Sequence, residues 1–405
     1  MHRHPSQTES LHCISGLSGL TAACETHCAM TDRSRCGVLA RLADLFQAVG
    51  HCWTAPDTAT FADSSGRPPL HAAASCGDTA ACQLLLDSAP EVALVADSDG
   101  YLPLHLAALH GRTGTCQLLL DRTPETVTAR GRKDRLPLHL AAHSGNTATC
   151  QLLLDRAPEA AVVADSLGWL PLHCVSQKGH TAACQLLLIG APEAATIADS
   201  EGWLALHLAA QSGHTVATCQ LLLDTAPDAA TVAVCNGHVP LHIAAAYGHT
   251  AVCQLLLERA PEAASLANTT GRTPLQLALA PGGGLPHLDT ARCLLAAGAA
   301  PAVLSALHST PAALPLYADF VNARTTLTSQ DWAAVPTPCP GLGVALPAKL
   351  ARSTDQARHL VQHLPPADAQ RLRIAALSLH RAQTALDLAV PRPIIQSILA
   401  LSLAA

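Results

Sequence analysis

A repeat with a period of about 34 residues is the feature that most restricts how this chain can fold. The stretch from Asp97 to Thr126 recurs with substitutions, giving seven copies in all. One cysteine marks the same place in each copy, at Cys82, Cys116, Cys150, Cys184, Cys219, Cys253 and Cys293. The steps between these cysteines are 34, 34, 34, 35, 34 and 40 residues. A period of this length predicts a solenoid, in which each repeat contacts only its neighbours.

Each copy predicts a turn followed by two helices. Turns such as Asp97-Ser-Asp-Gly100 place Asp first and Gly fourth, which suits a type I turn. Proline then fits the first position of a short helix, as at Pro103, and a glycine such as Gly111 ends that helix. A threonine, Thr113 in this copy, is placed to cap the second helix, which ends before a proline.

These residues resemble the ankyrin repeat, whose signature T-P-L-H-x-A belongs to a turn and two antiparallel helices. Leu104, His105 and Ala107 carry the L-H-x-A part, and the resemblance extends over about 240 of the 405 residues. It implies short inner helices and turn tips that form a concave binding face, backed by longer second helices. We therefore predict an all-α ankyrin-repeat solenoid of stacked helix-turn-helix units, with short hairpin turns and helical caps at both ends.

The copies depart from the family signature in two ways. Proline is replaced by alanine in the fifth copy, at Ala205. The signature threonine survives only as Thr273, which leaves the usual threonine-to-histidine hydrogen bond of the family in question for six copies. The residues at the threonine position in those copies are Pro68, Leu102, Leu136, Leu170, Leu204 and Val239.

The rest of the chain divides around the repeats at residues 62–301. Residues 1–36 are polar and contain four cysteines and several histidines, but no C-x-x-C pair, so a disordered leader is favoured over a zinc site. Translation from Met1 or from Met30 would keep every repeat. Residues 37–61 form a degenerate N-terminal capping half-repeat, because Thr54 to Phe61 closely matches Thr225 to Val232.

Residues 302–405 leave the repeat, and proline clusters cut them into short helical segments. Thr328 with Asp331, and Ser353 with Gln356, have the spacing of capping boxes that start helices. Two interpretations stay open for this region: a helical cap on the last repeat, or a small accessory domain.

Composition excludes several classes of protein. The net charge is −6 with only three lysines, so there is no basic field for nucleic acid. No run of 18 apolar residues exists, which excludes a membrane-spanning helix. Stacked helices lie about 8–10 Å apart, whereas a disulfide needs Cα atoms within about 4.4–6.8 Å. The repeated cysteines are therefore expected to be buried and reduced, which favours a cytoplasmic or nuclear location.

The presence of one histidine at the same place in each copy suggests a metal site as one hypothesis. These residues are His71, His105, His139, His173, His207 and His242, with Gln276 in the seventh copy. Side chains one repeat apart, about 10 Å, cannot share an ion whose bonds are about 2 Å long. In the ankyrin family this histidine is structural and bonds backbone between repeats. No nucleotide-binding, metalloprotease or nucleophile-elbow motif appears, so we expect no enzyme activity, cofactor or metal.

Positions that differ from copy to copy are the candidates for binding, since constant positions hold the fold together. The residue after the turn glycine varies and includes Tyr101, Trp169 and Trp203, three of only ten aromatic residues. The two residues before the stopping glycine vary as well. In the ankyrin geometry both sets line the concave face, and aromatic residues and arginine dominate interface energetics. The candidate set is Arg67, Tyr101, Leu109, His110, Arg135, His143, Trp169, Gln177, Lys178, Trp203, Gln211, His238, Tyr247 and Arg272.

Two interpretations of the residues after the turn glycine stay open, because Trp and Arg at this place in ankyrin arrays also stack on the next turn. For the surface as a whole we predict a binding groove centred on repeats two to five. The protein is then a monomeric, non-catalytic scaffold for one or more partner proteins. The alternative is a substrate-recognition adaptor of a ubiquitin ligase that uses the C-terminal helical segment, although Arg371 to Arg381 show no match to the cysteine-containing helix of such adaptors.

Overall fold

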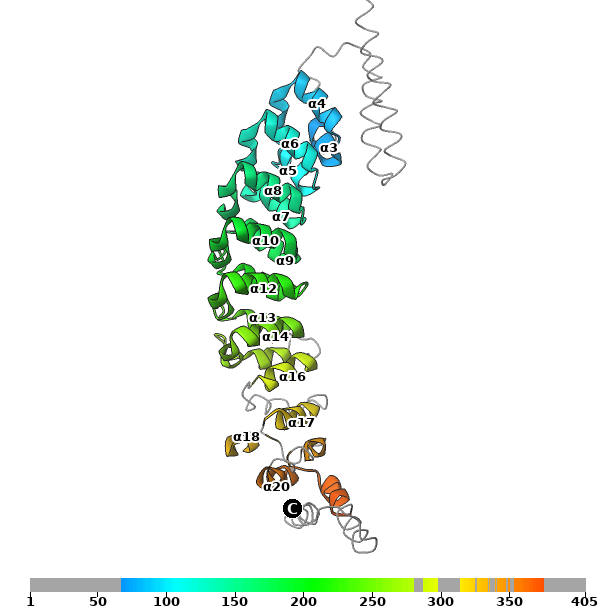
Figure 1. Cartoon of the computed structure of the whole chain (residues 1–405), viewed down its shortest axis with the longest axis vertical. Coiled ribbons are helices and arrows are strands. Elements are labelled where there is room, and N and C mark those ends of the chain that lie inside the picture. The colour runs from blue at the N-terminus through cyan, green and yellow to red at the C-terminus, as the bar shows by residue number, and fades with distance from the viewer. Residues whose placement is uncertain are drawn as a thin grey trace, which may run out of the picture. The chain divides into compact units, whose positions relative to one another are not determined.

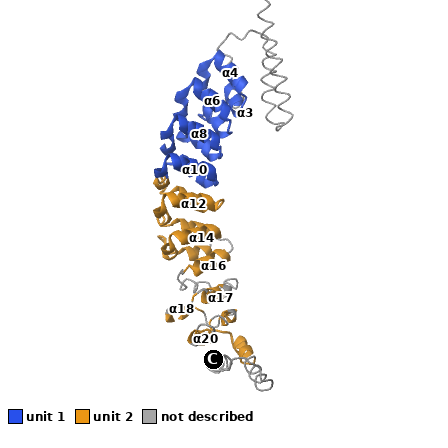
Figure 2. Cartoon of the chain, in the orientation of Figure 1, with its two compact units in different colours: residues 1–194 blue, residues 195–405 orange. Residues whose placement is uncertain are grey.

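The computed structural model describes residues 67–279, 287–297, 314–324, 326–333, 335, 339, 341–346, 349 and 353–374. Every regular element within these residues is a helix, which confirms the predicted all-α repeat fold. The predicted leader and the capping half-repeat, residues 1–61, lie outside the described residues. The chain divides into two compact units, residues 1–194 (unit 1) and 195–405 (unit 2), and each is described by itself (Figure 2).

Unit 1 holds two rows of helices from successive repeats (Figure 1). The inner row consists of α3 (Pro69–Cys76), α5 (Pro103–Leu109), α7 (Pro137–His143) and α9 (Pro171–Lys178). The outer row consists of α4 (Thr79–Ser88), α6 (Thr113–Arg122), α8 (Thr147–Arg156) and α10 (Thr181–Gly190). Consecutive helices pack side by side within each row. After each outer helix a 3-10 turn begins at proline: η2 (Pro90–Leu94), η3 (Pro124–Thr128), η5 (Pro158–Val162) and η6 (Pro192–Thr196).

Unit 2 continues the same plan. Its inner helices are α11 (Ala205–Ser212), α13 (Pro240–Tyr247) and α15 (Pro274–Leu279). Its outer helices are α12 (Val216–Thr225), α14 (Thr250–Arg259) and α16 (Leu288–Ala296), with η7 (Pro227–Ala230) and η8 (Pro261–Ser265) between repeats. In the fifth repeat alanine at Ala205 starts the inner helix where the other repeats use proline.

Small side chains allow the helices of each row to pack closely. Ala107 and Ala108 on α5, and Ala141 and Ala142 on α7, are fully buried. The repeated cysteines of α4, α6, α8 and α10 are also fully buried and free, which agrees with the prediction that neighbouring ones do not bridge. Burial of about 25 cal/mol per Å² of apolar surface, summed over such positions, is the main source of stability.

The predicted threonine caps are wrong for α6 and α8. Thr113 is the first residue of α6. The N-cap residue is Arg112, whose side chain makes no capping hydrogen bond to the helix. The reason is the tight turn, in which the N–H of Thr113 donates to the carbonyl of Gly111 at 3.0 Å and draws the threonine inside the helix. Its hydroxyl instead bonds the hydroxyl of Thr149 in the next repeat at 2.8 Å.

The residue after the stopping glycine links the second, third and fourth repeats each to the one before. Arg112 donates from Nε to the carbonyl of Ser75 at 3.2 Å, and Asn146 donates to the carbonyl of Leu109 at 3.1 Å. His180 bonds the carbonyl of His143 at 3.2 Å. The last carbonyls of a helix have no hydrogen-bond donor within it. These side chains supply donors to carbonyls that would otherwise bond only to water.

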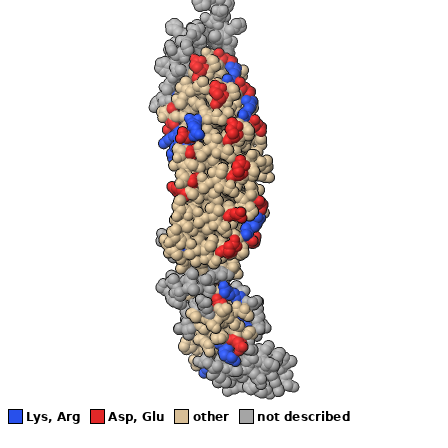
Figure 3. Space-filling model, turned by 90° about the vertical axis from the view of Figure 1, so that its left-hand side faces the viewer, with Lys and Arg blue, Asp and Glu red and all other residues tan. Residues whose placement is uncertain are grey.

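Exposed ion pairs run along the outer helices. Arg122 pairs with Asp87 at 2.5 Å and Arg156 with Asp121 at 2.7 Å. Figure 3 shows acidic and basic side chains alternating along one edge of unit 1. Such exposed pairs contribute at most about 1 kcal/mol each. In the fourth repeat Ile189-Gly190 replaces the charged pair, and Ile189 is 75% exposed.

The region after the repeats adds α17 (Leu314–Ala323), α18 (Ser329–Ala333), η11 (Leu342–Ala345) and α20 (Thr354–Gln362) to unit 2. Helix α17 packs on α16, and Arg292 bonds Asp319 at 2.5 Å between them. The predicted capping box at Thr328 and Asp331 is present, with bonds of 2.8 and 3.2 Å.

The second predicted capping box is only half formed. The hydroxyl of Ser353 accepts from the N–H of Gln356 at 3.4 Å. The Gln356 side chain leaves the helix end, because it accepts from the N–H of Leu327 and donates to its carbonyl, both at 3.0 Å. Gln356 therefore joins α20 to the segment before α18.

Two glycines of unit 1 should respond to alanine in opposite directions. Gly145 has φ +72°, and an added Cβ would lie 2.5 Å from Nδ1 of His180. We expect Gly145→Ala to lower the free energy of unfolding by about 2 kcal/mol, from the left-handed backbone and the displaced histidine. Gly190 ends α10 with no atom within 4 Å of an added Cβ, so Gly190→Ala should raise stability by up to about 1 kcal/mol. Urea denaturation of both variants measures the difference, and equal effects would contradict this account.

Candidate functional site

The turns of unit 1 fix the backbone of the variable aromatic residues. Asp97 Oδ1 accepts from the N–H groups of Asp99 at 3.0 Å and of Tyr101 at 2.9 Å. The N–H of Gly100 donates to the carbonyl of Asp97 at 2.9 Å, which closes the predicted turn. In the fourth repeat Asp165 Oδ1 likewise accepts from Trp169 N–H at 2.9 Å. The side-chain acceptor thus holds the residue that follows the turn glycine.

Unit 2 repeats this arrangement in its fifth and seventh repeats, whereas the sixth has Val234 at this place and closes its turn through the backbone. Asp199 Oδ1 accepts from the N–H of Trp203 at 2.8 Å. In the seventh repeat the acceptor is an amide, because Asn268 Oδ1 takes the N–H of Arg272 at 2.8 Å. Aspartate and asparagine both offer the oxygen that this turn requires.

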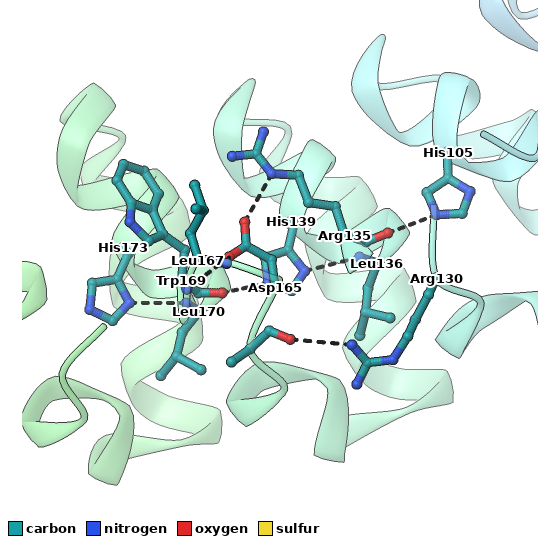
Figure 4. A network of polar contacts seen from close by, with 11 residues as sticks. His105, Arg130, Arg135, Leu136, His139, Asp165, Leu167, Trp169, Leu170 and His173 are labelled. Atoms are coloured by element: carbon teal, nitrogen blue, oxygen red, sulfur yellow. Dashed lines mark hydrogen bonds and ion pairs between the residues drawn. The ribbon is translucent and has the colours of Figure 1, made fainter. Parts of the chain in front are cut away.

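The histidine ladder, defined as His71, His105, His139, His173, His207 and His242, joins inner helices to backbone that follows within the same unit. His105 Nδ1 accepts from the N–H of Leu102 at 3.2 Å, and its Nε2 bonds the carbonyl of Arg135 at 3.0 Å. His139 makes the same two bonds to Leu136 and Trp169, at 3.1 and 2.9 Å (Figure 4). Because Nδ1 accepts, the proton lies on Nε2, which donates. The predicted structural role of these histidines is confirmed.

The missing signature threonine is explained by the same geometry. In repeats two to six the histidine ring accepts the backbone N–H of the apolar residue that stands at the threonine position, so no hydroxyl is needed. In the first repeat that residue is Pro68, which has no N–H to donate. In the seventh repeat Gln276 replaces histidine and its Oε1 accepts from the N–H of Thr273 at 2.8 Å. In unit 2, His207 bonds the carbonyl of Val232 at 3.0 Å, whereas His242 bonds that of Arg272 at 3.1 Å.

Burial keeps the ladder histidines neutral. It lowers the pKa of His105, His139 and His242 to about 4, although the backbone carbonyls that they contact act in the opposite direction. A charged imidazole would lose the acceptor nitrogen that the inner helix uses at its first turn. These rings are therefore suited to hold repeats together and do not serve as acid–base groups near neutral pH.

Three candidate binding residues contact the polar side chain of the next turn. Arg135 Nε lies 3.1 Å from Oδ2 of the buried Asp165. Arg67 lies 3.5 Å from Asp97 in the same manner. In unit 2, His238 bonds the amide of Asn268 at 2.8 Å. These side chains therefore connect adjacent turns, whatever else they contact.

The aromatic candidates cover the ladder histidine of their own repeat. Tyr101 lies 5.6 Å from His105 between ring centroids, and Trp169 lies 6.4 Å from His173. In unit 2, Trp203 meets His207 edge-on at 6.0 Å. All three aromatic rings are half-buried. One part of each ring thus packs on the array, and the other part faces solvent, where a partner is able to reach it.

The candidates at the ends of the inner helices are the more accessible set. Lys178 is exposed, and Leu109, His110, His143 and Gln177 are half-buried. In unit 2, Tyr247 is 53% exposed and stacks on His249 at 6.1 Å. Gln211, which is half-buried, donates to the hydroxyl of Tyr247 at 3.3 Å. These residues lie at the opposite end of the inner helices from the turn tips.

Sequence comparison of the copies missed two groups that shape this surface. One is the turn aspartate, which fixes the aromatic backbone in addition to forming the turn. The other is the residue after the stopping glycine, such as Asn146, which bonds the preceding helix. Its signal was present in the sequence, because polar residues recur there at Asp78, Arg112, Asn146, His180 and His249.

The described residues hold no group of three or more His, Cys, Asp or Glu side chains arranged to bind a metal ion. Burial raises the pKa of the thiols of Cys82, Cys116, Cys150 and Cys219 to about 12. Thiols in this state are poor nucleophiles and poor ligands. Over the same part of the chain, no helix has the length and apolar character needed to cross a bilayer.

Comparison with known proteins gives one family. A family model of ankyrin repeats (3 copies) matches residues 45–130, 125–197, 190–264 and 206–305. A search of curated proteins finds no match. The matched residues include every turn and inner helix described above, and they begin before the first described residue.

The histidine ladder should make stability depend on pH. The pKa of His139 is about 4 in the folded chain and about 6.5 when unfolded. The stability that neutral His139 provides is therefore complete above pH 6.5 and is lost as pH falls toward 4. Between these two pH values, the free energy of unfolding falls by about 1.4 kcal/mol per pH unit for each such histidine as the pH is lowered. Urea denaturation across this range should show a smaller slope for His139→Gln, the substitution that Gln276 represents naturally; parallel curves would contradict the assignment.

The cysteines should differ sharply in reactivity. Cys235 is exposed, whereas Cys116 and Cys150 are fully buried and their thiols stay protonated. We expect iodoacetamide near pH 8 to alkylate Cys235 in the native protein and to reach the two buried residues only in urea. Mass spectrometry of tryptic peptides measures this. Rapid native labelling of Cys116 would show that the outer helices open.

Proposed function

The chain belongs to the ankyrin-repeat family, and from this premise we propose that it is a non-catalytic scaffold that binds partner proteins through its turn tips and inner helices. Ankyrin repeats are a protein–protein interaction module. The proposal also specifies which residues of this chain contact the partner. The observation that carries it is the set of aromatic residues whose backbone is held on both sides and whose rings remain half-exposed.

Trp169 illustrates the argument in unit 1. Its N–H is bound by Asp165 in its own turn, and its carbonyl is bound by His139 of the preceding repeat. A side chain on a fixed backbone loses little conformational freedom when a partner binds, so more of the contact energy appears as affinity. Trp and Tyr are also the residue types most often found as interface hot spots. Tyr101 is held by Asp97 and His71 in the same way.

The distribution of sequence variation supports the same surface. The ladder histidine, the stopping glycine and the outer cysteine recur through the array because they hold the fold together. The residue after the turn glycine changes from arginine to tyrosine, tryptophan and histidine, although its carbonyl accepts from the first N–H of the turn in repeats two to seven. Selection for a particular partner would act on this kind of position. In unit 2 the corresponding residues are Trp203, His238 and Arg272.

The fully buried, reduced cysteines support a proposal that the protein works in a reducing compartment, the cytoplasm or the nucleus. The alternative role as a ubiquitin-ligase adaptor depends on a helix over residues 371–381. Most of that segment, from residue 375 onward, lies outside the described residues. No observation in the described part of the chain favours the adaptor role, so we do not propose it.

Affinity capture with the full chain tests the proposal. The test variant combines Trp169→Ala with Trp203→Ala, and the control combines Gln185→Ala with Gln220→Ala on the exposed outer side of α10 and α12. Proteins recovered by the wild type and by the control should fall at least about tenfold with the tryptophan variant, because each hot-spot residue contributes about 2 kcal/mol or more. Undiminished capture with an unchanged melting curve would exclude this surface.

A further inference from the structure

The turn of the third repeat differs from all the other turns in charge. Residues 130–135 read Arg-Gly-Arg-Lys-Asp-Arg, where the second repeat has Ala-Asp-Ser-Asp-Gly-Tyr. We call residues 130–135 the basic turn. It places four cations within six residues of a chain that has a net charge of −6 and only three lysines. One of those three lysines, Lys133, occupies its tip.

The backbone of the basic turn is unusual as well. Lys133 and Asp134 have φ of 59° and 57°, and they are the two non-glycine residues with left-handed φ in the described part of the chain. The other turns place glycine at the position of Asp134, as at Gly100 and Gly168. Non-glycine residues in this conformation are strained, and such strain concentrates at functional sites. The repeat offers glycine as an unstrained solution here, but this turn does not use it.

Close packing against the preceding repeat sets the start of the basic turn. Gly131 stands where the second and fourth repeats have aspartate. A Cβ at Gly131 would lie 2.7 Å from Cδ1 of Tyr101 and 2.9 Å from Nε2 of His105. The turn therefore lacks the aspartate oxygen that holds the turns of the second, fourth and fifth repeats. It closes through backbone bonds alone, from Gly131 N–H to the carbonyl of Arg135 at 2.9 Å and from Asp134 N–H to that of Gly131 at 3.0 Å.

The contacts of the four cations leave most of their donors available. Arg135 uses Nε on Asp165 and is the least exposed of the four. Arg132 bonds Asp99 at 3.1 Å with its side chain 59% exposed. Arg130 makes one long bond, 3.5 Å, to the carbonyl of Ala164.

Lys133, at the tip of the turn, has the least constrained side chain of the four cations. Its side chain is exposed, and only its carbonyl is engaged, by the N–H of Ser166 at 2.9 Å. Asp134 is the single acid of the turn itself. Figure 3 shows a group of basic side chains with acidic neighbours on the surface of unit 1. Each guanidinium has five donors in a planar fork that matches a carboxylate, and one contact leaves the rest unused.

We propose that the basic turn binds an acidic segment of the partner protein, with Arg130, Arg132 and Lys133 as the contacting residues. The proposal rests on the proposed function, because the occupant is part of the protein that the array binds. Charge complementarity selects the occupant, since Asp and Glu side chains match these donors. The ring of Tyr101, in contact distance of Gly131, places an aromatic anchor beside the cations. The basic turn thus continues the surface formed by the turn tips.

The test measures direct binding of a defined probe to the full chain. Fluorescein-labelled decaglutamate is titrated with the wild type at low salt, about 50 mM, and again near physiological salt, where the Debye length is about 8 Å. The test variant combines Arg130→Gln, Arg132→Gln and Lys133→Gln. The control combines Arg122→Gln, Arg156→Gln and Arg259→Gln, which removes the same charge from the exposed pairs of the outer helices. Arg135 is kept because it holds Asp165.

We expect decaglutamate binding to weaken at least about tenfold in the test variant and less than about twofold in the control. Equal losses in both would show that net charge alone is responsible, and no loss in either would exclude the basic turn. Absence of wild-type binding, or tighter binding of labelled oligothymidine than of decaglutamate, would also overturn the proposal.

A second variant guards against loss of folding. Lys133→Gly removes the tip charge and relieves the left-handed backbone, so we expect a higher melting midpoint together with weaker decaglutamate binding. The tryptophan variant separates this inference from the proposed function. If it keeps partner capture while the basic-turn variant loses decaglutamate, the aromatic surface fails and the basic turn stands. If decaglutamate binding is unaffected by the basic-turn variant, this inference fails independently of partner capture.

Discussion

The array depends on a neutral imidazole that uses both of its nitrogens. In each unit, Nδ1 of a ladder histidine accepts the N–H at the start of its own inner helix, and Nε2 donates to the backbone of a following turn, as His105 does between Leu102 and Arg135. The same ring therefore starts one repeat and positions another. Burial keeps the ring neutral, because desolvation disfavours the charged form. A charged ring would also lose the acceptor nitrogen, since Nδ1 would carry a proton. Ala107 and Ala108, on the same helix as His105, are fully buried as well.

The function proposed for this chain follows from the same bonds. A turn residue such as Trp169 is placed by Asp165 on one side and by His139 on the other, so its identity is free to change without altering the backbone. Variation and rigidity are thereby combined at one position. Residues such as Arg135 and His238 show the other use of that freedom, since they reach the next turn and strengthen the array.

The repeat period, the proline starts and the glycine stops could be read from the sequence, because they depend on local backbone preferences that recur at a fixed spacing. The caps of α6 and α8 could not be placed, because the backbone bonds from Thr113 to Gly111 and from Thr147 to Gly145 draw each threonine one position into its helix. Contacts between repeats were also hidden. Nothing local to Gly131 reveals that Tyr101 and His105 occupy the space beside it, and nothing local to Gln356 reveals that its side chain turns toward Leu327. The candidate surface was recognised as a set of variable positions, but the division of each ring between packing and exposure required the three-dimensional arrangement.

The contact of Gly131 with Tyr101 and His105 limits how interchangeable the copies are. A repeat with aspartate at this position, such as the fourth, would bring a Cβ against the aromatic ring of the second repeat if it were placed third. The array is therefore an ordered series in which the choice of residue at one tip restricts the choice at the next. A repeat would have to be duplicated or exchanged together with its neighbour to keep such contacts. The stability of the array therefore depends on the order of the copies as well as on their average sequence.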